Sequence, residues 1–158
     1  MSASVHHAID RFVEVTAASG VLFQPLEHAP WIDALEARLS WRLPPSFRSL
    51  VTRYAFLPFE AGPLELWGNM GSNAEDELSV AIFADKALAK VLLKGGCIPF
   101  ARPESGDYDR ICFDARPPAH NREHPIVRID HESVLCYREI SVTERIAPSF
   151  LHFVQMIE

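Results

Sequence analysis

The sequence predicts an α+β fold, in which a mostly antiparallel sheet is flanked by N-terminal helices and a C-terminal helix. Apolar residues keep helical spacing up to about residue 54, and short runs with aromatic and β-branched residues then alternate with turn residues. Helical spacing returns after Pro148. Helices followed by strands and one closing helix are typical of the α+β class. At 158 residues the chain fits a single domain over 1–158.

Three helices are predicted in the N-terminal third. The first spans Val5 to Ala17, with Ser4 as N-cap and apolar residues at i, i+3, i+4 and i+7. The second begins at Pro30, a residue suited to the first helical position, and continues through Leu39. The third lies in "LPPSFRSLVTRYAF", where one apolar stripe is formed by Phe47, Leu50, Val51 and Tyr54.

The sheet is predicted to begin after Pro58. "LELWGN" and "ELSVAIFAD" are expected as strands, or as a strand and a loop. "DKALAKVLLK" is predicted as a short helix, capped by Asp85 and ended by Gly95-Gly96. Four further strands are expected in "CIPFA", "DRICFDA", "PIVRID" and "SVLCYREI", whose regular spacing favours antiparallel neighbours. Pro148 then opens a final helix, "PSFLHFVQMIE".

Composition excludes several classes of function. The net charge is −6 and the basic residues are scattered singly, so nucleic-acid binding, which needs a basic face, is not expected. Nor is a membrane partner, because no apolar run approaches the roughly twenty residues that cross a bilayer. The N-terminus lacks the pattern of a signal peptide, and the three widely spaced cysteines suit reduced, buried thiols. We therefore expect a cytoplasmic protein.

Most of the chain, roughly residues 28 to 157, resembles the SUKH superfamily of fungal cell-wall-assembly regulators and bacterial immunity proteins. "IDALEARLSWRLPPSFRSLVTRY" is similar to that family's helix pair joined by a Leu-Pro-Pro turn. "IPFA", Gly106-Asp107 and "CFDA" resemble its central element, and "HPIVRID" followed by "IAPSFLHFV" resembles its last strands and C-terminal helix. The chain departs from the family after the third helix, where Tyr54 to Pro58 replace an Asn-Gly-Gly-like turn.

The resemblance implies a non-enzymatic domain without a cofactor that binds another protein. In bacteria that partner is often a secreted toxin, so we expect an immunity protein. Two alternatives stay open at this point. The chain could be a regulatory or scaffold domain without a toxin partner, or a hydrolase that uses clustered acids or a metal.

The stretch "IPFARPESGDYDRICFDAR" carries the acids on which the hydrolase alternative depends. Pro, Ser, Gly and Asp in "PESGDYDR" are the residues of a tight turn, which favours a hairpin over a catalytic carboxylate cluster. The strand after it alternates Ile111 and Phe113 with Cys112 and Asp114, which suggests half burial.

Five residues are predicted to bind the partner. An exposed acidic turn would speed encounter with a basic protein, and an exposed tryptophan could anchor an interface. The predicted contacts are Glu104, Asp107, Asp109, Glu123 and Trp67.

"HNREH", His120 to His124, matches the H-x-x-E-H pattern of a group of zinc proteases. That pattern binds zinc only on a helix, and here it lies between Pro117-Pro118 and Pro125. We therefore expect a solvated loop. No C-x-x-C pair, nucleophile motif or phosphate-binding loop is present, so no metal ligand or catalytic residue is predicted.

Overall fold

The computed structural model describes residues 3–70 and 77–157. Its larger sheet has six antiparallel strands in the order β3-β4-β5-β6-β7-β8. They are β3 (Phe59–Ala61), β4 (Leu64–Leu66), β5 (Cys97–Pro103), β6 (Arg110–Asp114), β7 (Ile126–Ile129) and β8 (Val142–Ala147). A separate antiparallel pair joins β1 (Phe23–Pro25) to β2 (Tyr54–Phe56). The predicted antiparallel sheet is confirmed.

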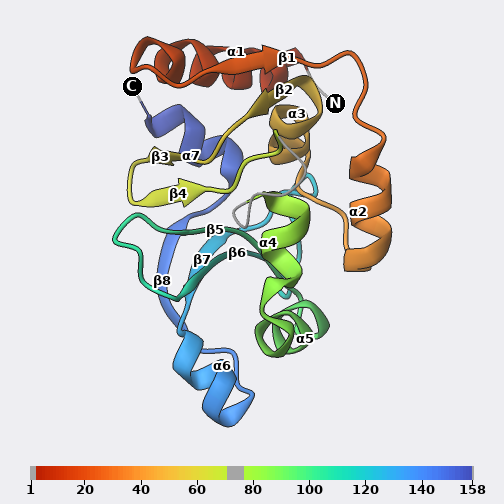
Figure 1. The fold of residues 1–158 in the computed structure, drawn as a ribbon, viewed down its shortest axis with the longest axis vertical. Helices are drawn as coiled ribbons and strands as arrows, with labels where there is room; N and C mark the ends of the chain where they lie inside the picture. The colour runs from red at the N-terminus through yellow and green to blue at the C-terminus, as the bar shows by residue number, and fades with distance from the viewer. Residues whose placement is uncertain (1–2, 71–76, 158) are drawn as a thin grey trace.

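Helices cover both faces of the central strands (Figure 1). On one side α1 (Ala3–Ala18), α3 (Pro45–Arg53) and α7 (Phe150–Met156) pack against one another, with α2 (Trp31–Leu39) beside them. On the other side α5 (Lys86–Lys94) contacts α6 (His131–Tyr137). The helix before α5, α4 (Leu78–Ala84), contributes its buried residues to the larger core. The predicted α+β arrangement, with N-terminal helices and a closing helix, is therefore confirmed.

The larger core is built around aromatic side chains. The ring of Phe47 on α3 lies 5.2 Å from Phe100, 5.1 Å from Phe113 and 5.2 Å from Phe150, measured between ring centroids. Phe100 and Phe113, on neighbouring strands, stack at 3.9 Å. The predicted stripes on the first and third helices are buried in this core, except that Tyr54 lies in β2.

The opposite face of the central strands is buried as well. Cys97, Cys112 and Val127 pack there with Leu88 and Leu92 of α5, and Val134 of α6 belongs to the same cluster. Cys112 and Asp114 on β6 are both buried, so the expected half burial of this strand is wrong. The reason is that α5 and α6 cover the face that alternation alone would leave to solvent.

Two predicted strands are wholly or partly helical. "ELSVAIFAD" forms α4, because Leu78, Ala81 and Ile82 bury one helical face. "SVLCYREI" lies mostly in α6, which begins where the Asp130 carboxylate accepts hydrogen bonds from the backbone N–H and the hydroxyl of Ser133. Arg138, with φ of 55°, ends this helix before β8.

Of the predicted helix caps, Asp85 is confirmed, whereas the prediction of Ser4 as N-cap is wrong, because Ser4 lies inside α1. Asp85 accepts hydrogen bonds from the backbone N–H groups of Ala87 and Leu88 at 3.1 Å, as expected for the start of α5. The turn after α3, where the chain departs from the family pattern, is an extended segment that forms β2. Asn69 organises it: its Oδ1 accepts from the Phe56 N–H, and its Nδ2 donates to the carbonyls of Val51 and Tyr54.

Candidate functional site

The acidic turn between β5 and β6 is the first part of the candidate site, and it connects two antiparallel strands as predicted. Glu104 and Asp107 are exposed in it, and Gly106 has φ of 80°, which glycine adopts at little cost. One carboxylate oxygen of Asp107 accepts the backbone N–H of Asp109 at 2.9 Å. Glu104 is fixed through its own N–H, which donates to the carbonyl of Pro63. Two of the predicted partner contacts are thus held on an ordered turn.

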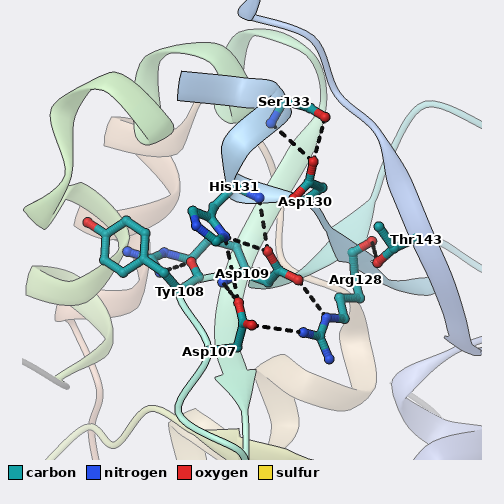
Figure 2. Close-up of polar contacts among 9 residues, drawn as sticks. Asp107, Tyr108, Asp109, Arg128, Asp130, His131, Ser133 and Thr143 are labelled. Carbon is teal, nitrogen blue, oxygen red and sulfur yellow. Dashed lines mark hydrogen bonds and ion pairs between the residues drawn. The ribbon is translucent and has the colours of Figure 1, made fainter. Parts of the chain in front are cut away.

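Asp109 is placed quite differently, because it is buried. Its carboxylate lies between Arg128 and His131 (Figure 2). Its Oδ2 accepts a hydrogen bond from Arg128 Nε at 2.7 Å. Its Oδ1 accepts from the backbone N–H of His131 at 3.0 Å and lies 2.7 Å from His131 Nδ1. Burial opposes ionisation, but these hydrogen bonds outweigh it and hold the pKa of Asp109 below its usual value. Asp109 therefore connects the start of β6 to β7 and α6, and the expectation that it is exposed is wrong.

Asp107, Asp109 and His131 also satisfy the spacing of a metal site, since one ligand atom from each lies within 4.8 Å of the others. Their bonding argues against that use. Arg128 approaches both carboxylates, with Nε 2.7 Å from Asp109 and Nη2 3.6 Å from Asp107. A divalent cation would have to displace this guanidinium from the same oxygens. The donor set fits an ion-pair network better than a metal centre, and the Asp109 carboxylate has little capacity left for acid–base chemistry.

Glu123 is also committed to the fold. Its Oε1 accepts the backbone N–H of Ser46, and its Oε2 accepts the Ser46 hydroxyl, both at 2.8 Å. Burial raises the pKa of Glu123, although the Ser46 hydrogen bonds oppose the shift. Glu123 is therefore partly buried and bonded to Ser46 instead of being free in a solvated loop, and its contact with a partner stays a prediction.

The segment from His120 to His124 contains no helix, as predicted. Asn121 and Arg122 both have positive φ, and the Glu123 N–H donates to the His120 carbonyl, so a tight turn separates the two histidines. A zinc site of the H-x-x-E-H type needs a helix, which this turn does not provide.

Trp67 lies in the core, with 3% of its surface exposed, so it is not the exposed tryptophan that the sequence led us to expect. Trp67 nevertheless lines a groove of about 660 Å³ beside the acidic turn. The guanidinium carbon of Arg110, which lines the same groove, lies 5.8 Å from the centroid of the Trp67 ring and 4.5 Å from that of the Tyr108 ring. Trp67 and Asp107, far apart in sequence, therefore line one groove.

Two exposed side chains with apolar surface also line this groove. Tyr108 is 46% exposed and Val80 of α4 is 42% exposed. The Tyr108 hydroxyl donates to Asp85 Oδ2 at 2.6 Å, which ties the turn to the start of α5. Sequence reasoning missed Tyr108 and Val80. The position of Tyr108 inside a turn was a usable signal, whereas Val80 lay in a segment predicted as a strand or loop.

Comparison with known proteins supplies the family context. The model of the SMI1 / KNR4 family (SUKH-1) matches residues 29–156, nearly the range over which the sequence resembles the SUKH superfamily. No curated protein matches the sequence significantly. Among the helices of the described residues, none has both the length and the apolar character that crossing a membrane requires.

Proposed function

The chain belongs to the SMI1 / KNR4 family (SUKH-1), and from this premise we propose that it is a non-catalytic domain that neutralises a toxin by binding it directly. The observation that carries the proposal is which acidic side chains are bonded within the fold and which are exposed. Asp109 and Glu123 stand in the acidic stretch and in the H-x-x-E-H pattern on which a hydrolase would depend, and they are bonded to Arg128, His131 and Ser46. The acids that stay exposed lie on a fixed turn beside a groove.

That turn and groove, comprising Glu104, Asp107, Tyr108, Arg110 and Val80, are the surface we assign to the partner. Glu104 and Asp107 would attract a basic protein and accelerate its encounter. Tyr108 and Val80 offer apolar area next to them, and aromatic side chains often carry much of an interface's binding energy. The hydrogen bonds of the turn to Asp85 and Pro63 reduce the ordering cost of binding.

The test combines capture with protection. The immobilised chain is incubated with native lysate and secreted proteins, retained proteins are identified by mass spectrometry, and each is expressed in cells with and without the chain. We expect a retained protein that arrests growth alone and is harmless when the chain is co-expressed. The Glu104→Lys/Tyr108→Ala variant should lose both capture and protection.

Glu27→Lys is the matched control. Glu27 is an exposed acid on the connection between β1 and α2, and its replacement by lysine changes the charge by the same amount as Glu104→Lys. It should behave like the wild type. Undiminished capture by the Glu104→Lys/Tyr108→Ala variant would refute the assigned surface. Capture without protection would instead support a scaffold. A hydrolase would be favoured if protein purified without chelator carried stoichiometric metal and gained stability with added zinc.

A further inference from the structure

A second cleft, of about 750 Å³, lies on a different part of the molecule from the groove of the proposed partner site. It is bounded by α2, the connection from α2 to α3, the start of α3 and the loop between β6 and β7. This volume is within the range of small-molecule sites, about 300–1,000 Å³. Its walls combine apolar residues, among them Trp41 and Leu43, with three arginines.

The three arginines of the cleft differ in whether they are paired with an acid. Arg48 is held by two acids, with Nε 3.1 Å from Glu36 Oε1 and Nη2 2.9 Å from Asp33 Oδ1. Arg42 and Arg122 are exposed at the cleft, and neither has a hydrogen bond or ion pair within residues 3–70 and 77–157. The other carboxylate oxygen of Glu36, Oε2, accepts a hydrogen bond from the backbone N–H of Leu43. The cleft therefore offers two free guanidinium groups although the whole chain carries a net charge of −6.

The loop that carries one of these arginines is ordered before any ligand arrives. Arg122 occupies a tight turn with φ of 62°, and its neighbour Glu123 anchors that turn to Ser46 at the start of α3. Arg42 follows Trp41, whose indole N–H donates to the carbonyl of Leu93 at 2.7 Å. Both arginine backbones are thus held in place, Arg42 in the α2–α3 connection and Arg122 in the loop between β6 and β7, which lowers the cost of bringing the two charges onto one anion.

His124 is a further polar residue that lines the same cleft. Within the described part of the chain its Nδ1 is buried and has no hydrogen-bond partner in the protein. Burial lowers the pKa of His124, which favours a neutral ring with one N–H to donate.

We propose that this cleft binds a phosphate monoester, with Arg42 and Arg122 on the phosphate oxygens and the organic part against Trp41 and Leu43. Guanidinium groups match phosphate geometry in bidentate fashion, and a dianion with three terminal oxygens uses more than one of them. The cleft is larger than a phosphate alone requires, and its apolar wall gives the remaining volume a complementary surface. The proposal is independent of the protein-binding function.

Titration by two-dimensional NMR tests the proposal on the intact chain. Inorganic phosphate, phenyl phosphate and a phosphotyrosine peptide are added at constant ionic strength, and the side-chain N–H signals of the arginines are followed. We expect saturable shifts at Arg42 and Arg122, with phenyl phosphate binding at least several-fold more tightly than inorganic phosphate. Arg42→Gln and Arg122→Gln should each weaken phenyl phosphate about tenfold.

Arg145→Gln is the control, since Arg145 is an exposed arginine on β8 outside the cleft, and it should leave the affinity unchanged. Shifts that rise linearly without saturation, or an affinity equal in all four proteins, would overturn the proposal. Equal affinity for inorganic and phenyl phosphate would overturn the role of the apolar wall. A peptide that binds as tightly as phenyl phosphate would identify a protein-borne phosphate as the source, and exclusion of the peptide would identify a small molecule.

Discussion

The Glu123 carboxylate caps the helix that starts near Ser46, 77 residues earlier in the chain. Both of its oxygens are used, one by the backbone N–H and one by the hydroxyl, each at 2.8 Å. Ser46 is fully buried, so no water is available to replace these bonds. The loop between β6 and β7 is thereby fastened to α3, and the acid serves stability.

Replacing Glu123 by alanine should therefore destabilise the protein. Glu123→Ala leaves the buried Ser46 N–H without an acceptor, and we expect the free energy of unfolding in urea to fall by about 1–3 kcal/mol. Glu123→Gln keeps one acceptor and should cost much less. Equal losses in the two variants would mean that the cap contributes little. Because the folded-state pKa of Glu123 is raised, its contribution is present below the unfolded-state pKa and is lost as pH rises through the folded-state pKa. The Gln variant should lack this pH dependence.

The contribution of Asp109 to stability should depend on pH in the opposite direction. Its folded-state pKa is lowered, so its contribution to stability is present above the unfolded-state pKa and is lost as pH falls through the folded-state pKa. We expect Asp109→Asn to lower the free energy of unfolding at pH 7 by about 1–3 kcal/mol and to flatten the acid limb of the stability profile. Asp107→Asn is the control, because it retains the acceptor for the Asp109 N–H at an exposed position. The interpretation fails if both variants show the same profile.

Asn69 should be sensitive even to an isosteric change. Its amide group donates to Val51 and Tyr54 and accepts from Phe56, so Asn69→Ala leaves three backbone groups unpaired where α3 meets β2. A loss of about 1–3 kcal/mol is expected in denaturant unfolding. Asn69→Asp should cost at least as much, because a carboxylate would face two carbonyl oxygens. An Asp variant as stable as the wild type would contradict this assignment.

Gly68 is required for a different reason: the backbone of Phe56 and Leu57 lies so close to it that no side chain fits. A Cβ at this position would lie 2.5 Å from the carbonyl oxygen of Phe56 and 2.9 Å from Pro58 Cδ. We expect Gly68→Ala to lower the melting temperature clearly, by a destabilisation of about 1–3 kcal/mol. Gly106→Asn is the comparison, since nothing lies within 4 Å of a Cβ there and asparagine tolerates positive φ. A smaller effect at Gly68 than at Gly106 would refute the steric argument.

The cysteines should react unequally with a thiol reagent at pH 8. Cys97 and Cys112 are buried, and burial raises the pKa of Cys97 to about 11, whereas Cys136 is exposed. Because the thiolate is the reactive form, native protein should modify rapidly at Cys136 alone, and unfolded protein should modify at all three. Mass spectrometry of the modified peptides measures this. Rapid labelling of Cys112 in native protein would contradict the burial of both faces of β6.

Sequence periodicity predicted most of the elements of the fold. The stripe of Ile9, Phe12 and Val13 is buried as expected, and so are Phe150 and Phe153 of the closing helix. The errors concern short segments. α4 and α6 have seven residues each, too few for periodicity to separate a helix from a strand. The Asp-x-x-Ser start of α6 was the sequence signal that could have corrected that assignment.

The sequence by itself determined the family, the α+β class and the acidic turn, because these depend on local spacing and on residue types that suit turns. Only the tertiary structure decided which acids face solvent. Asp109 is buried where β7 and α6 bring Arg128 and His131 to it, and Glu123 is partly buried where α3 brings Ser46 to it. The two clefts are likewise formed by segments far apart in the chain. Burial and pairing arise from such distant contacts, and a sequence pattern records only the neighbours along the chain.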